Sequence, residues 1–305
     1  MQVMTVRGPI DPGDLGPTLP HEHLILDLFR ISRNRDHRFN DVPLMIEEAA
    51  RFKACGGGTI VELSNHGLSP NPVGLRRISE ESDLHVVMGS GWYREPYYDH
   101  QYIGQRSTRD LADDIVRDIE EGVSGTGIRP GIIGEIGADL SFVSPAEEHV
   151  FRAAARAHLR TGLAITTHAL ESPVGLQQLD ILEEEGADLR RVVVGHAATW
   201  PSLDYHEAIA RRGAYVQFDT IRGLRPYETE QQVRLTLDLI GRGYLERILL
   251  SQDNCFQSHL VAYGGNGFAF VSTTFAPILK EAGLSDEQVR TILVENPRRV
   301  LAGAA

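Results

Sequence analysis

Short apolar runs recur along the chain, and each is followed by a longer segment with helical periodicity. The runs are rich in β-branched residues and mostly lack a polar–apolar alternation, which is typical of strands buried on both faces of a parallel sheet. Eight runs occur, at residues 18–21, 59–63, 85–88, 131–134, 164–167, 192–195, 214–218 and 247–251. We expect each run to form a strand.

The segments between the runs carry signals for helices. Residues 147–159 place apolar side chains near a 3.6-residue period, after a capping-box start at Ser144. Gly162 ends this pattern, as glycine commonly does at a helix C-terminus. Two more helices are predicted on similar grounds, over residues 231–240 and 285–293.

Eight strands that alternate with helices predict an α/β fold, a single (β/α)8 TIM barrel over residues 1–305. An open doubly wound sheet is the alternative. The strand count favours the barrel, and so do several polar residues that stand where an apolar run ends. In a barrel the C-terminal strand ends converge on one mouth, where the active sites of this fold lie.

Six side chains of the kinds that bind transition metals stand at these strand ends. His21 and His23 end the first run, and two residues two apart on a strand point to the same side. The others follow runs four, five, six and eight: Glu135, His168, His196 and Asp253. Singly, each has a simpler explanation, such as a hydrogen-bonded core histidine or a helix cap. Together, four imidazoles and two carboxylates suit two divalent metal ions.

The composition limits the classes of molecule that we expect the chain to bind. The 42 acidic and 30 basic residues leave a net charge of -12, which argues against nucleic acid or an anionic membrane as partner. Cys55 and Cys255 give no disulfide framework, which fits a reducing compartment. With no membrane-length apolar stretch and no signal-peptide pattern, we expect a cytoplasmic location and a small-molecule substrate.

Several motifs resemble, in order, the phosphotriesterase-related proteins of the amidohydrolase superfamily, over essentially the whole chain. They are Arg7-Gly8-Pro9-Ile10, His21-Glu22-His23, Gly134-Glu135-Ile136-Gly137, Thr167-His168, Val194-Gly195-His196, Phe218-Asp219-Thr220, Ser251-Gln252-Asp253 and Val294-Glu295-Asn296-Pro297. The set most resembles the phosphotriesterase homology proteins. These carry Glu on the fourth strand, where phosphotriesterases and lactonases carry a carboxylated lysine. The only lysines here, Lys53 and Lys280, lie elsewhere.

The resemblance implies how the six side chains divide between two divalent ions. The more buried ion would be held by His21, His23 and Asp253. The more exposed ion would be held by His168 and His196, with Glu135 and a hydroxide bridging both. Asp253 would also accept a proton as the general base. Zinc is the expected metal, with manganese or cobalt as alternatives.

Loops after the strands should supply the substrate contacts. An aromatic stretch follows the third run, and we expect a wall for an apolar group formed by Trp92, Tyr93, Tyr97 and Tyr98. The alternative is a loop that packs on its neighbours or on a dimer partner. Arg222, after the seventh run, is a candidate to bind an anionic substrate, and His259 is a further candidate contact.

The sequence therefore predicts a metal-dependent hydrolase whose bridging hydroxide attacks a lactone or carboxylic ester, with weak phosphotriesterase side activity. The alternatives are an N-acyl amide hydrolase, since a vertebrate relative of this kind is an amidase, and a metal-binding barrel without turnover. A pure binder would not need Asp253 as a base.

Glu62, at the end of the second run, is the alternative base or a hydrogen-bonded buried carboxylate. A homodimer is a candidate assembly.

Overall fold

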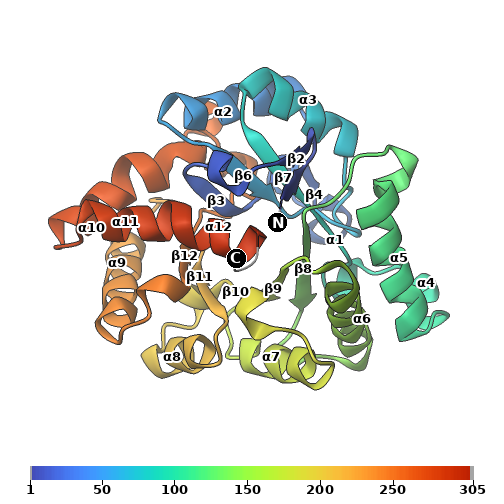
Figure 1. Cartoon of the computed structure of the whole chain (residues 1–305). Helices are drawn as coiled ribbons and strands as arrows, with labels where there is room; N and C mark the ends of the chain where they lie inside the picture. The colour runs from blue at the N-terminus through green and yellow to red at the C-terminus, as the bar shows by residue number, and fades with distance from the viewer. Residues whose placement is uncertain (1, 303–305) are drawn as a thin grey trace.

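A barrel of parallel strands forms the centre of the computed structural model, which describes residues 2–302. Its eight strands follow the order β12-β11-β10-β9-β8-β7-β6-β3, and helices surround them (Figure 1). All eight predicted strands are confirmed: β3 (Thr18–Glu22), β6 (Thr59–Glu62), β7 (His85–Ser90), β8 (Ile132–Ala138), β9 (Ile165–Ala169), β10 (Val192–Gly195), β11 (Tyr215–Phe218) and β12 (Ile248–Leu250).

The outer helices lie mostly between successive strands. They are α1 (Phe29–Ser32), α2 (Val42–Ala54), α3 (Pro72–Ser82), α4 (His100–Gly104), α5 (Thr108–Glu121), α6 (Pro145–Thr161), α7 (Gly175–Glu184), α8 (Leu203–Arg211), α9 (Pro226–Gly241), α10 (Ala276–Glu281), α11 (Asp286–Arg290) and α12 (Asn296–Ala302). The capping box predicted at Ser144 is present at the start of α6, and Gly162 adopts a left-handed φ of 71° at its end. Among residues 2–302, no helix is long and apolar enough to cross a membrane.

Near the C-terminus the structure differs from the expected helix over residues 285–293. Ser285 caps α11 as predicted, since its hydroxyl accepts a hydrogen bond from the Gln288 amide at 3.2 Å. The α-helix ends at Arg290, however, and Thr291–Glu295 form a wider π-helical turn before α12 begins. Periodicity alone does not reveal this change, because one widened turn shifts the apolar face by only one residue.

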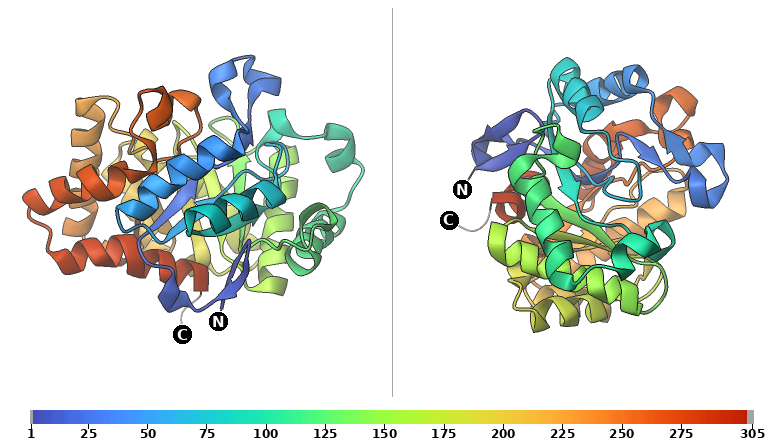
Figure 2. Two further views of the ribbon diagram at one scale, coloured as in Figure 1. Left: turned by 90° about the horizontal axis from the view of Figure 1, so that it is seen from above. Right: turned by 90° about the vertical axis from the view of Figure 1, so that its right-hand side faces the viewer.

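The barrel is closed at the end opposite the C-terminal ends of its strands. A short hairpin, β1 (Val3–Thr5) with β2 (Gly8–Ile10), and helix α12 lie together at this end (Figure 2). Their apolar side chains pack in one cluster with interior residues of the strands, among them Val87, Val193 and Leu249. A second small sheet, β4 (Leu26–Asp27) with β5 (Arg38–Phe39), lies in the long loop after β3.

Isolated hydrogen bonds, most of them made by side chains, join the first and last strands of the sheet. No backbone ladder pairs β3 with β12 within the described residues, and Pro20 in β3 has no amide hydrogen to offer. Instead the Ser251 hydroxyl lies 2.8 Å from the His21 carbonyl oxygen, and the Asp253 amide donates to the same oxygen at 3.2 Å. The Glu22 carboxylate accepts from the Gln252 amide at 2.7 Å. We call this β3–β12 contact the seam.

Candidate metal centre

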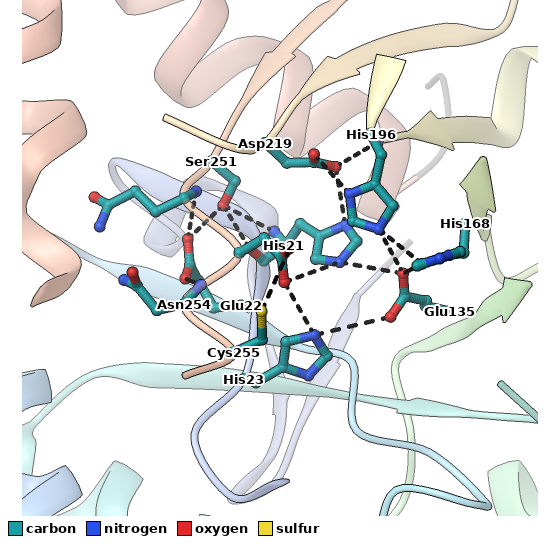
Figure 3. Close-up of polar contacts among 12 residues, drawn as sticks. His21, Glu22, His23, Glu135, His168, His196, Asp219, Ser251, Asn254 and Cys255 are labelled. Carbon is teal, nitrogen blue, oxygen red and sulfur yellow. Dashed lines mark hydrogen bonds and ion pairs between the residues drawn. The ribbon is translucent and has the colours of Figure 1, made fainter. Parts of the chain in front are cut away.

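The six ligand-type side chains meet at the C-terminal mouth of the barrel. Figure 3 shows five of them, from β3, β8, β9 and the end of β10, pointing toward one another. Asp253 follows β12 and completes the cluster. None of the six is more than 8% exposed. Buried imidazoles and carboxylates need hydrogen-bonding partners or ions to offset the loss of hydration. The six side chains must therefore be stabilised by one another or by bound ions.

Glu135 lies at the centre of the cluster. Its Oε2 is 2.7 Å from His168 Nδ1, 3.1 Å from His196 Nε2 and 3.4 Å from His21 Nε2. Its other oxygen, Oε1, is 3.8 Å from His23 Nε2. One carboxylate therefore faces four histidines, which is the position expected of a group shared by two ions.

Asp253 completes the arrangement on the β3 side. Its Oδ1 lies 3.3 Å from His23 Nε2 and 4.0 Å from His21 Nε2. His21, His23 and Asp253 form one group whose ligand atoms all lie within 4.8 Å of one another. A second such group consists of His21, Glu135 and His196. The structure thus brings together all six residues that the sequence predicts as ligands.

A buried carboxylate outside this set, Asp219, orients two of the histidines. Its Oδ1 is 2.9 Å from His196 Nδ1, and its Oδ2 is 3.1 Å from His21 Nδ1. Oδ2 also accepts a hydrogen bond from the His196 amide at 2.8 Å. Holding Nδ1 of both rings leaves both Nε2 atoms directed at Glu135. Carboxylate partners of this kind fix the orientation of metal-ligating imidazoles and raise their basicity.

A hydroxyl group plays the corresponding part for His23. Ser64 Oγ lies 2.9 Å from His23 Nδ1, which leaves Nε2 facing Asp253. The Ser64 amide in turn donates to Glu62 Oε2 at 3.3 Å, and the Leu24 amide donates to Glu62 Oε1 at 3.3 Å. Burial raises the pKa of Glu62 to about 7. Two roles were considered for Glu62, a general base and a hydrogen-bonded buried carboxylate. Its contacts match the second role.

The electrostatics of the cluster favour bound cations. Burial opposes charge on Glu135, yet the neighbouring His21 and His168 hold its pKa well below the usual range. Burial likewise opposes charge on His21, but the carboxylates of Glu135 and Asp219 raise its pKa well above the usual value. The carboxylates of the site therefore attract positive charge, and a divalent ion can supply that charge.

Unpaired nitrogen atoms fit the same conclusion. Within residues 2–302, His21 Nε2 and His168 Nε2 are buried without a hydrogen-bond partner. Buried polar atoms rarely stay unsatisfied, and imidazole nitrogens beside carboxylates form the donor set that zinc and similar ions prefer. The residues present therefore fit a divalent metal.

The backbone adopts unusual conformations at two of the six positions. His196 has a φ of 57° and Asp253 a φ of 48°, both in the left-handed region. Residues held in this region are uncommon outside glycine, and they cluster at functional sites where the surrounding structure over-determines them. Here the Asp219 contacts fix the first residue, and the seam fixes the second.

Arg222 lies against Asp253 rather than free in solvent. Its Nη2 donates to Asp253 Oδ2 and, at 2.8 Å, to the Asp253 carbonyl oxygen. Its Nε donates to the Gln252 carbonyl at 3.0 Å. Burial opposes charge on Asp253, but Arg222 and the nearby histidines lower its pKa. Asp253 thus stays ionised, with one oxygen toward Arg222 and the other toward His23.

A cavity of about 690 Å³ opens above the cluster. His23, Glu135, His168, His196 and Asp253 form part of its floor, and aliphatic side chains such as Leu28 and Leu170 form part of its walls. Of the expected substrate contacts, the cavity is lined by Tyr93, Tyr97 and Arg222. Three others lie outside this lining: Trp92, Tyr98 and His259.

The positions of these three residues have physical explanations. Trp92 turns toward His66 and Tyr102 and lines a neighbouring cavity. Tyr98 is buried at 3% exposure, below the surface of the loop. His259 packs against Phe256, and its Nδ1 lies 3.3 Å from the Cys255 amide. Sequence alone does not reveal which way successive residues of an irregular loop will point.

Sequence reasoning missed the residues that hold the ligands in place. Asp219 had a detectable signal, since it is the only carboxylate directly after the seventh run and belongs to a family-like motif. Ser64 had none, because a serine two residues beyond a strand is common in any loop. Hydrogen-bond partners depend on side-chain direction, which strand position alone does not specify.

Comparisons with known proteins match the chain over nearly its whole length. The model of the phosphotriesterase family matches residues 1–301. The phosphotriesterase homology protein of Escherichia coli K12 is 38% identical over 282 residues, covering 92% of this chain and 96% of that protein. The crystal structure of the phosphotriesterase homology protein from Escherichia coli, complexed with phosphate in its active site, has 37% identity and a TM-score of 0.91 over 94% of this chain and 99% of that chain.

A second group of relatives carries a different name. The N-acetyltaurine hydrolase of Dictyostelium discoideum is 32% identical over 277 residues, which cover 87% of this chain and 74% of that protein. The family match spans nearly the whole chain, and these relatives cover most of it. The chain therefore belongs to the phosphotriesterase family of hydrolases.

Proposed function

We propose that this protein is a binuclear metal-dependent hydrolase that cleaves a lactone or carboxylic ester. The observation that carries the proposal is the position of Glu135, which faces four histidines within a buried cluster. His21, His23 and Asp253 would hold one ion and His168 and His196 the other, with Glu135 between them. Zinc is the first choice for this donor set, and manganese or cobalt suits it as well.

The side chains of the cluster then have distinct tasks. When bound, two divalent ions would supply an activated water and polarise the scissile oxygen. Asp253 would take up the proton of the attacking water, because its ionised carboxylate lies at the cavity floor. Arg222 holds Asp253 in place from the opposite side. Tyr93 and the aliphatic walls exclude solvent around the acyl group of the substrate.

An N-acyl amide is the second candidate substrate, and the N-acetyltaurine hydrolase relative favours it. Ester and amide hydrolysis share the attack on an acyl carbon and differ in the leaving group. Amine loss requires a proton on nitrogen, which protonated Asp253 is placed to return. Slow phosphotriester turnover would be a side activity of the same site.

One experiment tests the metal and the bond together. The purified protein is stripped with chelator, reloaded separately with zinc, manganese or cobalt, and analysed for metal content. Each form is then assayed on a lactone, a carboxylic ester, an N-acyl amide and a phosphotriester. We expect about two ions per chain and the highest kcat/KM on a lactone or ester.

Two outcomes would contradict the proposal. A protein that holds no transition metal after reloading would not be a metal-dependent hydrolase. A metal-loaded protein that cleaves only the amide would replace the first candidate substrate with the second. Asp253→Asn provides the matched control, because turnover that persists in this variant would come from a contaminating enzyme or another base.

A further inference from the structure

Arg94 lines the cavity above the candidate metal centre, and the function proposed above assigns it no task. It lies in the loop after β7, directly before the 3-10 turn Glu95–Tyr97. Its side chain keeps 23% of its surface exposed. Arg222, the other arginine of the lining, is already bound to Asp253. Arg94 is therefore the first candidate for a charged contact with a ligand.

A carboxylate behind the cavity wall fixes the Arg94 guanidinium. Its Nη1 donates to Asp139 Oδ1 at 2.5 Å, and Asp139 does not line the cavity. The guanidinium carbon lies 5.1 Å from the ring centroid of Tyr93 and 5.3 Å from that of Tyr97. A guanidinium has five N–H groups, and the Asp139 carboxylate and the Tyr97 hydroxyl together cannot occupy them all. Since Nε is buried, the N–H groups left for a ligand are those of the Nη atoms.

The guanidinium lies one aromatic ring away from the candidate metal centre. The Tyr93 ring contacts not only Arg94 but also the His168 ring, at 5.0 Å between ring centroids. Gly137 permits this close packing, because a Cβ there would lie 2.9 Å from Arg94 Cβ and 3.3 Å from His168 Cβ. A small molecule whose scissile bond lies at the centre can therefore reach Arg94 with its other end.

We propose that the substrate carries a carboxylate, which Arg94 binds while the scissile bond lies at the metal centre. This inference rests on the hydrolase function proposed above. Guanidinium N–H groups form strong, charge-assisted hydrogen bonds with carboxylates. Asp139 already offsets one unit of positive charge, so a carboxylate monoanion suits Arg94 better than a phosphate dianion. Arg94 thus determines specificity for an acidic lactone, ester or N-acyl compound.

Binding is tested without turnover on a matched pair of probes. They are 3-oxocyclopentane-1-carboxylate and its carboxamide, ring ketones that have the shape of a lactone but no bond to hydrolyse. Titration calorimetry on the zinc-reloaded full-length protein gives Kd for each, and inorganic phosphate is titrated as a third ligand. We expect the parent to bind the carboxylate more tightly than the amide. Arg94→Met should weaken binding of the carboxylate alone, by about 10- to 100-fold.

Two further variants separate recognition of the ligand from support of the loop. Asp139→Asn removes the partner of Arg94 but keeps the guanidinium, so this variant should bind the carboxylate at least as tightly as the parent. Arg77→Met removes an exposed arginine of α3 that lies outside the cavity lining, and should bind both probes like the parent. If Arg94 only supported its loop, Arg94→Met and Asp139→Asn would change the binding of both probes alike.

Turnover is measured on two further pairs, one for each candidate bond. The lactone pair is 5-oxotetrahydrofuran-2-carboxylate and its carboxamide, and the amide pair is N-acetylglycine and N-acetylglycinamide. Arg94→Met should lower kcat/KM for the acid of the pair that is cleaved, mainly through a higher KM, and leave the neutral member near the parental value. Arg94→Lys keeps the charge without the planar fork and should recover part of the loss.

The proposal is overturned if Arg94→Met leaves carboxylate affinity unchanged, or if it weakens the acid and the amide alike. It is also overturned if phosphate loses more affinity than the carboxylate. Should Arg94→Met fail to fold, equal affinity of the parent for the acid and the amide still overturns the proposal. Failure of the proposed hydrolase is distinguishable, because none of the four substrates would then be cleaved while Arg94→Met still loses carboxylate binding.

Discussion

Single side chains determine how the candidate metal centre is ordered. Asp219 contacts the Nδ1 atoms of both His21 and His196, so one carboxylate sets the direction of two rings from different strands. Its burial would be costly without these partners, and they hold its pKa below the usual range. Its effect on the centre is therefore indirect, through the orientation of the rings.

This arrangement predicts that Asp219→Asn weakens metal retention without removing a ligand. Partners of metal-bound histidines typically contribute about 10- to 100-fold in metal affinity. Competition with a chelator on the purified variant measures the effect. Asp204→Asn, at a helix start away from the cluster, is the control. Unchanged retention in Asp219→Asn would show that the rings hold their orientation without it.

Asp253 carries a second prediction at this scale. Asp253→Asn should lower kcat by about 10²- to 10⁴-fold while KM changes little, because the variant loses the proton acceptor and keeps the cavity. Steady-state kinetics on a true substrate, with metal content matched to the parent, provide the measurement. Glu228→Gln alters another carboxylate of the same cavity and should stay near parental activity. A near-normal kcat in Asp253→Asn would assign the base to another residue.

In the proposed centre Glu135 would take the place of a carboxylated lysine, and this assignment has a consequence for assembly. A carboxylated lysine forms from CO2, whereas Glu135 carries a permanent carboxylate on β8. Neither Lys53 nor Lys280 lies on that strand. Metal-free protein should therefore regain activity with metal alone in CO2-depleted buffer. Glu135→Gln should retain less metal, because the amide lacks the negative charge; a bicarbonate requirement in the parent would contradict this assignment.

At the scale of elements, hydrogen bonds at helix ends are strong local determinants. Ser144 Oγ accepts from the Glu147 amide at 3.2 Å, and Glu147 Oε2 accepts from the Ser144 amide at 2.9 Å. Glu147 Oε1 also accepts from the Asp139 amide at 2.8 Å, so the start of α6 holds the loop that follows β8. The cap therefore couples a peripheral helix to the strand that carries Glu135.

Removing this cap should have a measurable effect on stability. Ser144→Ala is expected to lower the free energy of unfolding by about 0.5–2 kcal/mol, the usual contribution of an N-cap side chain. Urea denaturation followed by circular dichroism provides the value. Ser144→Thr keeps a hydroxyl acceptor and should recover most of the loss. Equal stability of the alanine variant and the parent would mean that the remaining contacts hold the helix start.

The elements also show what the sequence could predict. Strands β6, β7 and β10 are buried on both faces, so their apolar runs are continuous and their positions are clear. Helix α9 begins at Pro226, five residues before the expected start at Gln231, because no side-chain cap marks its first turn. Ligands at strand ends are predictable since the fold brings those ends together. Contacts such as Ser64 with His23 are not, because they depend on loop side-chain directions.

For the whole molecule, the proposed ions would join segments that are distant in sequence. His21 and His23 belong to β3, and Asp253 follows β12, so one ion would be bound from both sides of the seam. An ion that binds only the folded state stabilises it by RT ln(1 + [L]/Kd), where [L] is the concentration of free ion. At an ion concentration of 100 times Kd, this stabilisation is about 2.7 kcal/mol.

Metal removal should therefore lower the melting temperature of the whole protein. Differential scanning calorimetry of stripped and reloaded protein gives the comparison, and Glu135→Gln should show a smaller difference than the parent. Hydrogen exchange should become faster along β3 and β12 in the stripped form, while the hairpin β1–β2 at the far end stays unchanged. Identical melting temperatures with and without metal would show that the seam is held by its own hydrogen bonds.

The seam also imposes an order on biosynthesis. A ribosome makes His21 and His23 more than two hundred residues before Asp253. During that interval a nascent chain carries two imidazoles with no partner strand to complete the set. If these three residues hold an ion, loading follows release of the last strand from the ribosome. Truncated chains that end before Asp253 would then remain metal-poor, which makes metal loading a signal that synthesis has passed the last strand of the barrel.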